Sequence, residues 1–367
     1  IRFYSWGAGE CCLPAGATKA TLRDDEENRL LLRPGDVLVF EERFNPRTGS
    51  EADADPNHRH AVRLTRVYPE AEIDAEGRRT AGALVTDLLF VDPIQPIVEI
   101  EWGAEDALPF PVCISAIADG EQGPEYVEDV SVALGNVVLA DHGLAVGDEP
   151  LGTVPDPVLL WPPTRNGDRC VRPQREPVPP RFRPHLQRRP LTQAAPDPFA
   201  GDRPGQPVPA SVAMLSSPHE ALPAIILNTV AEEPEPPWHP RRDLLNSGPG
   251  DHHFVVEIET DGLATLRFGD DRFGERPNAG AQFTASYRVG NGLQGNVGAG
   301  AIALVVSSES GITAVRNPLP ARGGTGKEGI EDERKSATAA FRTQELSLIH
   351  ISEPTRLKTR SRMPSSA

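Results

Sequence analysis

Prolines gather in one stretch of the chain, residues 150–240, which holds 22 of the 38 prolines in the 367-residue sequence. Proline fixes its own φ, lacks a backbone donor and pushes the preceding residue towards extended geometry. Regular helix or sheet is therefore not expected here. We predict a Pro-rich extended segment that joins two β-rich domains, residues 1–149 and 241–345.

This middle segment has two possible roles. It can be a stiff linker, because Pro-rich chains favour extended conformations, or an arm that becomes ordered only against a neighbouring subunit. Residues 172–189 are also locally basic. A solvated linker needs no large apolar side chains, so the arm is favoured by those interspersed along the segment: Phe182, Leu186, Leu191, Phe199 and Leu215.

Short apolar runs and alternation of apolar with polar residues, the period of a half-buried strand, recur on both sides of this segment. Asp261-Gly262 predicts a hairpin with a type I′ turn, which needs positive φ at both central positions. One helix is predicted at 330–341, where acidic residues come early and alanines late. The fold class expected is mainly β with minor α, an α+β arrangement. The predicted strands are 36–40, 61–67, 83–90, 97–102, 136–140, 253–260, 263–269, 282–289 and 301–306.

Charge and hydropathy exclude several classes of protein. The net charge is −16, which argues against nucleic acid as a partner because phosphate binding needs a basic face. No apolar run approaches the ~18 residues of a membrane span, so no span is expected. Aromatic residues make up only 5% of the chain, and the many prolines indicate a loop-rich protein instead of a compact enzyme.

Cysteine and histidine supply the candidate metal ligands: Cys11, Cys12, His58, His60 and Cys113. Their nitrogen and sulfur atoms suit zinc, but the chain has no C-x-x-C spacing and the separations are long and irregular. Buried thiols and polar strand histidines explain the same residues, so no metal site is predicted. Four cysteines without a disulfide framework favour a reducing compartment.

Two glycine-rich motifs resemble nucleotide sites without matching them. Residues 290–295 read G-x-G-x-x-G, but the glycines that follow oppose the helix that a dinucleotide site requires. We predict a loop that reverses tightly through positive φ. Residues 323–327 resemble a phosphate-binding loop, yet Ala321 replaces its first glycine and Glu328 its Ser/Thr. No cofactor is therefore predicted.

The remaining histidines do not indicate a catalytic residue. His252, His253 and the pair Asp141-His142 stand beside no obvious nucleophile and in no G-x-S-x-G context. We predict that the chain is not an enzyme. At the far end, residues 346–367 are expected to be a translated sequencing adapter and are left out of the fold prediction.

Several short motifs follow one another along the chain: 4–7 (YSWG), 10–14 (ECCLP), 58–62 (HRHAV), 135–143 (GNVVLADHG), 238–245 (WHPRRDLL), 253–257 (HFVVE), 266–270 (LRFGD), 287–292 (YRVGNG), 295–299 (GNVGA), 317–321 (NPLPA) and 323–325 (GGT). In this order they closely resemble baseplate assembly proteins of phage-like contractile injection systems, which carry a baseplate J-like region. The likeness covers nearly all of residues 1–345, and it implies that 241–345 is a truncated J-like domain.

The resemblance implies a structural wedge subunit that acts by protein–protein assembly. Its implied partners are other wedge subunits, the hub and spike, and the sheath, in a hetero-oligomeric ring. Such a subunit is cytoplasmic during assembly and afterwards part of a tail-like particle. Two other functions stay open: a surface protein that binds a ligand or carbohydrate, and a hydrolase.

Overall fold

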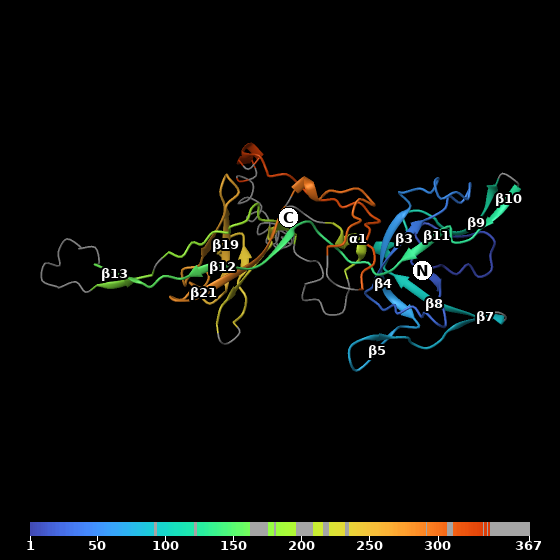
Figure 1. Cartoon of the computed structure of the whole chain (residues 1–367), viewed down its shortest axis with the longest axis horizontal. Coiled ribbons are helices and arrows are strands. Elements are labelled where there is room, and N and C mark those ends of the chain that lie inside the picture. The colour runs from blue at the N-terminus through green and yellow to red at the C-terminus, as the bar shows by residue number, and fades with distance from the viewer. Residues whose placement is uncertain are drawn as a thin grey trace, which may run out of the picture. The chain divides into compact units, whose positions relative to one another are not determined.

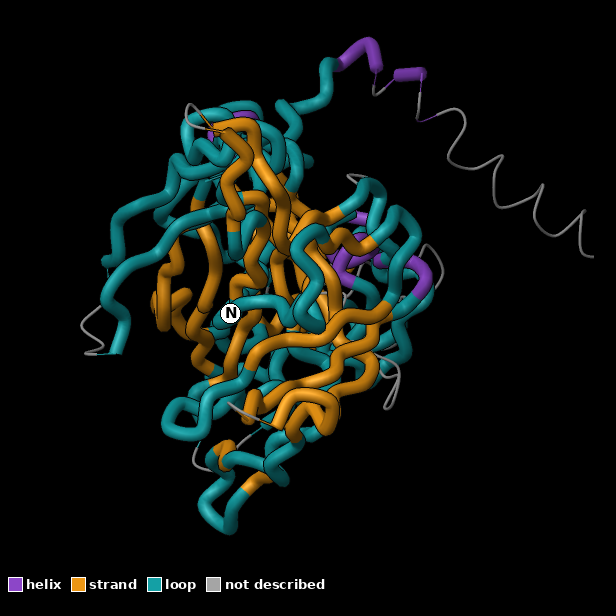
Figure 2. Tube along the Cα trace, turned by 90° about the vertical axis from the view of Figure 1, so that its right-hand side faces the viewer, coloured by secondary structure: helices purple, strands orange, loops and turns teal. Residues whose placement is uncertain are grey.

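Strands dominate the computed structural model, with 37% of residues in strands and 6% in helices, and this confirms the predicted mainly β class (Figures 1 and 2). Residues 1–324 form one compact unit and 325–367 a second. For 88–91, 94 and 176 only the backbone is described. The structure describes residues 1–91, 94–120, 123–161, 175–179, 181–195, 208–215, 220–231, 235–290, 292–306, 311–332, 334–335 and 337.

A six-stranded antiparallel sheet forms the N-terminal part, in the order β11-β3-β4-β8-β2 with β7 beside β8. Its core is built from side chains that alternate along the strands, such as Leu38 and Phe40 on β3, or Val62 and Leu64 on β4. Phe40 contacts both Phe3 and Trp102 edge to face, with ring centroids 5.0 and 5.3 Å away. The strands are β2 (Lys19–Arg23), β3 (Val37–Glu42), β4 (Arg59–Tyr68), β7 (Thr86–Val91), β8 (Ile94–Trp102) and β11 (Ser131–Leu134).

A second, three-stranded sheet in the order β1-β9-β10 lies within the same region of sequence. It consists of β1 (Cys11–Leu13), β9 (Val112–Gly120) and β10 (Gly123–Val127). Ile114 of β9 is buried in the same core as the large sheet. The other N-terminal elements are the short pair β5 (Glu72–Ile73) and β6 (Arg79–Thr80) and the 3-10 turn η1 (Ala104–Asp106).

Two further three-stranded sheets make a second core, and the Pro-rich segment contributes to both. One has the order β12-β21-β17, and in the other β18 runs parallel to β19 while β20 is antiparallel. Backbone hydrogen bonds between Leu227 and Trp238 join the two sheets. Their strands are β12 (Leu144–Thr153), β17 (Ile225–Thr229), β21 (Gln282–Val289), β18 (His239–Arg241), β19 (His253–Ile258) and β20 (Ala264–Phe268).

The expectation that residues 150–240 lack regular structure is wrong. Strand β17, a proline-free run, pairs with β21 and buries alternate side chains. Shorter strands or helix also form at 158–160, 176–178, 193–194, 210–213 and 222–223. Leu186 and Leu191 are buried in the second core and Phe182 packs against it, so these apolar residues serve the chain's own fold. Leu215 is exposed, and Phe199 lies outside the described residues. Much of the segment is therefore docked within its own chain.

The hairpin at residues 259–263 exists, but its turn differs from the predicted type I′. Gly262 alone has positive φ, at 85°, and its N–H donates to the carbonyl of Glu259 at 3.0 Å. This is a type I turn followed by a left-handed glycine, the three-residue hairpin loop. The Asp261 carboxylate accepts from the N–H of Leu263 at 3.0 Å, which stabilises the loop without left-handed geometry at Asp261.

Two predicted strands do not form. Residues 136–140 begin with Asn136, whose φ of 55° turns the chain out of the sheet after β11. Residues 301–306 make no strand pairing, and the Leu304 side chain is 86% exposed. In the second unit, residues 330–332, 334–335 and 337 are helical, as predicted. The end of the predicted helix and the expected adapter translation at 346–367 lie outside the described residues.

Smaller elements complete the description. They are the hairpin β13 (Val158–Leu160) with β14 (Glu176–Val178), the pair β15 (Gln193–Ala194) and β16 (Leu222–Pro223), helix α1 (Ala210–Ala213) and the 3-10 turn η3 (Gly292–Gly295). Within the described ranges, no helix is long and apolar enough to cross a membrane.

Candidate functional site

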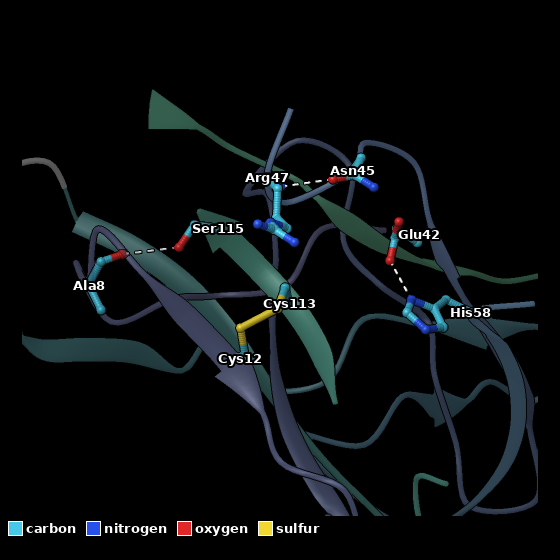
Figure 3. Close-up of a disulfide and its surroundings, with 8 residues drawn as sticks. All are labelled: Ala8, Cys12, Glu42, Asn45, Arg47, His58, Cys113 and Ser115. Carbon is cyan, nitrogen blue, oxygen red and sulfur yellow. Dashed lines mark hydrogen bonds and ion pairs between the residues drawn. A yellow bond between two sulfur atoms is a disulfide. The ribbon is translucent and has the colours of Figure 1, made fainter. Parts of the chain in front are cut away.

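A disulfide joins two of the candidate metal ligands, Cys12 and Cys113 (Figure 3). The residues face each other across the β1–β9 ladder, so the free thiols expected from the sequence are wrong for this pair. Disulfides are rare in reducing compartments, so these two cysteines do not indicate the reducing compartment that was expected. Cys11 is a free, partly buried thiol, and burial raises its pKa. The fourth cysteine, Cys170, lies outside the described residues. A sulfur–histidine zinc site is therefore not assembled here.

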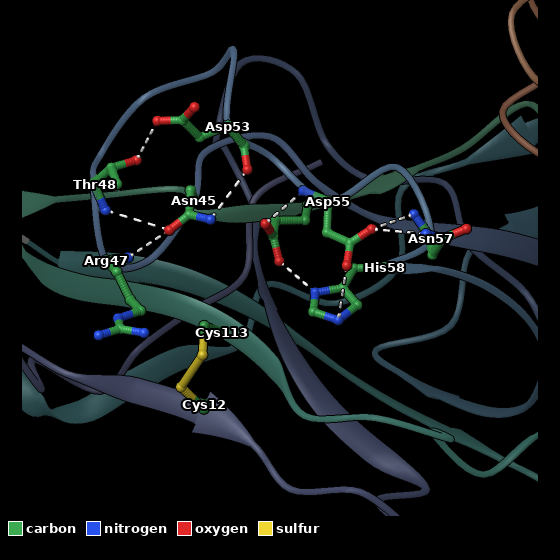
Figure 4. A network of polar contacts seen from close by, with 10 residues as sticks. Cys12, Asn45, Arg47, Thr48, Asp53, Asp55, Asn57, His58 and Cys113 are labelled. Atoms are coloured by element: carbon green, nitrogen blue, oxygen red, sulfur yellow. Dashed lines mark hydrogen bonds and ion pairs between the residues drawn. A yellow bond between two sulfur atoms is a disulfide. The ribbon is translucent and has the colours of Figure 1, made fainter.

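The two candidate histidines are held by other groups, and Figure 4 shows His58 beside Asp55. His58 Nδ1 contacts the carboxylate of Glu42, and its Nε2 lies 3.7 Å from Asp55 Oδ2. Its ring stacks on Phe110 at 4.7 Å between centroids. His60 Nε2 lies 2.9 Å from the carbonyl oxygen of Asp106. Both rings are thus fixed in place by their neighbours.

The loop before β4 satisfies its own polar groups. Asn45 accepts from the N–H of Arg47 at 2.9 Å and donates to the carbonyl of Asp53 at 3.0 Å. Thr48 Oγ1 donates to the Asp53 carboxylate at 2.9 Å. These contacts are turn chemistry, and they explain the acidic residues of the loop without a bound ligand.

A serine, a histidine and an aspartate meet at Ser247, His253 and Asp251, but without triad geometry. Ser247 Oγ lies 2.9 Å and Asp251 Oδ2 3.6 Å from the same ring nitrogen, Nδ1. A catalytic triad needs the serine and the acid on opposite nitrogens, whereas Arg241 donates to Nε2 at 3.1 Å. Burial, and then the charge of Arg241, lower the pKa of His253.

The two glycine-rich motifs meet each other in a backbone joint. The Asn296 side chain donates to the Gly324 carbonyl and accepts from its N–H, both at 2.8 Å. A Cβ on Gly324 would collide with the carbonyl oxygen of Gly292, and one on Gly295 would lie 2.8 Å from the Cβ of His142. The predicted positive φ is present at Gly290 and Gly292, at 111° and 79°. The glycines thus permit close packing of backbones.

Gly292→Val is expected to destabilise this joint without altering any nucleotide affinity. A β-branched residue in the left-handed region costs about 1–2 kcal/mol or more, and the measurement is urea unfolding. The control is Gly298→Val, because a Cβ on Gly298 would meet no atom within 4 Å and its φ is not positive. Equal midpoints for the two variants, or dinucleotide binding by the parent chain, would contradict the assignment.

Asp106 is 1% exposed and binds α1 to the N-terminal part. Its carboxylate accepts from the N–H groups of Ala210 (2.8 Å), Ser211 (2.9 Å) and Arg63 (3.0 Å), and from Ser211 Oγ (2.6 Å). Burial alone would raise the pKa of Asp106, but these hydrogen bonds, the Ser211 hydroxyl first among them, outweigh burial and lower it. Asp106 therefore acts as the N-terminal cap of α1 from 104 residues away.

Glu41 holds a second distant segment in the same manner. Its carboxylate, in a side chain 6% exposed, pairs with Arg59 Nη2 at 2.9 Å and with both terminal nitrogens of Arg316. Arg59 also donates to the carbonyl of Pro318 at 2.9 Å. The fork of an arginine matches a carboxylate in two places at once, so residues 316–318 are oriented as well as attached.

Apolar side chains join the segments held by these two carboxylates. Val39 of β3 and Ala61 of β4 are buried against Ala210 of α1, and Leu319 packs on the same cluster. We call Asp106, Glu41 and this cluster the docking face of the N-terminal sheet. It fastens one piece of the Pro-rich segment and one piece of the C-terminal region to the N-terminal part.

The docking face was missed by reasoning from the sequence, although one signal pointed to it. Residue 209, which precedes α1, is Pro209 and has no side-chain acceptor for the first helical N–H groups. A helix that starts without a local cap needs an acceptor from elsewhere. Nothing in the sequence identifies Asp106 as that acceptor.

The described side chains therefore form packing joints where the sequence offered candidate ligands. In the described part of the chain, no group of three or more His, Cys, Asp or Glu side chains is placed to hold a metal ion. An open depression is lined by Pro150, Phe182, Arg183, His185 and Gln187 among others.

No family model, no curated protein and no solved structure matches the chain.

Proposed function

We propose that this chain is a structural wedge-type subunit in the baseplate of a phage tail-like contractile injection system. It acts through contacts with other wedge subunits, the hub and spike, and the sheath, in a ring that assembles in the cytoplasm. The observation that supports the proposal is that several of the motifs on which the resemblance rests contribute residues to packing joints.

The N-terminal motifs supply contacts that hold the fold together. Tyr4 donates to the buried carboxylate of Asp87 at 2.8 Å, and burial together with this hydrogen bond raises the pKa of Tyr4 to about 12. Cys12 forms the disulfide, and Arg59 reaches Glu41. These three residues thus stabilise the fold, as expected of an assembly subunit.

The C-terminal motifs act in the same way. Trp238 is 3% exposed and stacks on His252 with ring centroids 4.6 Å apart. Tyr287 donates to the Glu149 carboxylate at 2.6 Å inside the second core, and Asn296 clasps Gly324. These three residues therefore contribute to packing within the chain.

The proposal is tested by locating the chain in particles. Deleting its gene in the organism that encodes it is expected to abolish assembled contractile particles, and restoring a tagged copy should bring them back. Gold particles directed at the tag should then label the baseplate end in electron micrographs. Normal particles in the deletion strain, or a genome without sheath and tube genes, would contradict the proposal.

The alternative, a surface protein that binds carbohydrate, gives the opposite pattern. The purified chain would then bind glycans as an isolated molecule, and particle assembly would not depend on it. A glycan-binding assay on the purified full chain therefore separates the two functions.

A further inference from the structure

The β13–β14 hairpin carries large apolar side chains that its own chain leaves uncovered. Its two strands pair with each other and with no third strand of the described part. Successive strand residues point to opposite faces, yet the described side chains of both strands are exposed, so neither face is packed. The exposed fractions are 54% for Val158, 57% for Leu159, 49% for Leu160, 60% for Trp161 and 43% for Val178. An isolated two-stranded hairpin is at best marginally stable in water.

This hairpin is also basic, in a chain whose net charge is −16. The Arg175 guanidinium lies over the Trp161 ring, 5.0 Å from its centroid. Residues 158–178, which span the hairpin, contain four arginines and two acidic residues. A surface complementary to the hairpin should therefore be apolar at its centre and acidic around it.

The chain itself presents such a surface on β9 and β10. In the antiparallel pairing of β10 with β9, Tyr126 lies opposite Ile117 and Pro124 lies opposite Asp119. Residues directly opposite each other share a face of the sheet, so all four lie on one face. Tyr126 is 51% and Ile117 48% exposed, whereas Ala118, on the other face, is buried. β10 is an edge strand of its sheet. Residues 112–130 contain five acidic residues and no Lys or Arg.

We propose that the β13–β14 hairpin of one copy docks on the exposed β9–β10 face of a second copy of this chain. Leu159 and Trp161 pack on Ile117 and Tyr126. Arg175, which lies over the Trp161 ring, approaches Asp119. Since hairpin and receptor face are different surfaces, the contact is heterologous and closes into a ring or extends into a filament. The proposal names one partner within the assembly role proposed above, on which it rests.

Sedimentation velocity on the purified full chain tests this contact. At low salt the parent should form oligomers that shrink at high salt, because exposed charges are screened. Trp161→Glu in the hairpin and Tyr126→Glu in the receptor face should each weaken self-association by about thirtyfold or more, the effect of losing a central aromatic anchor.

Mixing the two variants gives the sharpest result. Trp161→Glu keeps an intact receptor face and Tyr126→Glu keeps an intact hairpin, so the mixture should form one-to-one dimers and nothing larger. An isologous contact, or one made elsewhere, would leave the mixture monomeric or restore long oligomers. Circular dichroism should show both variants folded, because both side chains are exposed.

Leu245→Glu is the matched control, since Leu245 is 69% exposed and lies on neither surface. It should leave self-association unchanged, and an equal loss in this variant would overturn the proposal. A parent chain that stays monomeric at low salt would also overturn it. If that monomeric chain is still found at the baseplate, the assembly role stands, whereas self-association by a chain absent from particles would reject only that role.

Discussion

Replacing both bridged cysteines, in the variant Cys12→Ala with Cys113→Ala, is expected to lower the free energy of unfolding by about 4 kcal/mol. The disulfide joins residues 101 positions apart, and a cross-link that closes so long a loop removes much of the freedom of the unfolded chain. It fastens the three-residue strand β1 to β9. Urea unfolding of parent and variant measures the difference.

Cys11→Ala is the control, because Cys11 stands next to the bridge and is a free thiol. It should change the unfolding free energy by less than about 1 kcal/mol. Reductant should destabilise the parent and this control, but not the double variant. Alkylation without reduction should label Cys11 and leave Cys12 and Cys113 unlabelled. The prediction would be contradicted if the urea midpoint of the parent were the same with and without reductant.

Local patterns in the sequence identified much of the fold. The alternation in 61–67 and 282–289 corresponds to β4 and β21, and the Asp-Gly pair marks the hairpin between β19 and β20. These features depend on neighbours in the chain, which a single sequence displays directly. The expected hairpin geometry failed at Asp261, because two- and three-residue loops can share the same Asp-Gly signal.

Strand formation also depends on partners that local patterns do not reveal. Residues 301–306 have the composition of a strand, but no described strand lies beside them, so they remain outside any ladder. Conversely, β17 forms within a Pro-rich stretch because all five of its residues pair with residues of β21. A strand is stabilised by cross-strand pairs, so its presence is decided by residues far away in the sequence.

The candidate site shows the same limit more strongly. Cys12, Cys113, His58 and His60 were candidates because of their residue types. The sequence did not predict the disulfide between the two cysteines, nor the contact between His58 and Glu42. Asp106 and Glu41 are ordinary acidic residues in an acidic chain, and only their burial and their distant partners distinguish them. Contacts between residues far apart in the sequence could therefore not be predicted from the sequence alone.

The pH dependence of stability should reveal the role of Asp106. Its pKa is lower in the folded chain than the usual value near ~3.9 of an unfolded aspartate. A group with a depressed folded pKa stabilises the fold fully above its unfolded pKa, and this contribution is lost as pH falls through the folded value. The advantage of the parent over an uncharged variant should thus be constant near neutrality and shrink below about pH 4.

Asp106→Asn is expected to cost about 3 kcal/mol of unfolding free energy at neutral pH. The carboxylate accepts four hydrogen bonds, and the amide both removes the charge and turns a donor towards donors, which leaves buried groups unpaired. Hydrogen exchange at the Ala210 and Ser211 amides should accelerate with it, as α1 leaves the docking face.

Two comparisons make the Asp106 prediction specific. Ser211→Ala removes one of the four donors and should cost about 1 kcal/mol, while Glu105→Gln, at the exposed neighbouring position, should stay within about 0.5 kcal/mol of the parent. If Asp106→Asn lost the same free energy at low pH as at neutral pH, the charge of the carboxylate would not be what holds α1. Because α1 has no local cap, its exchange rates should report the loss of Asp106 directly.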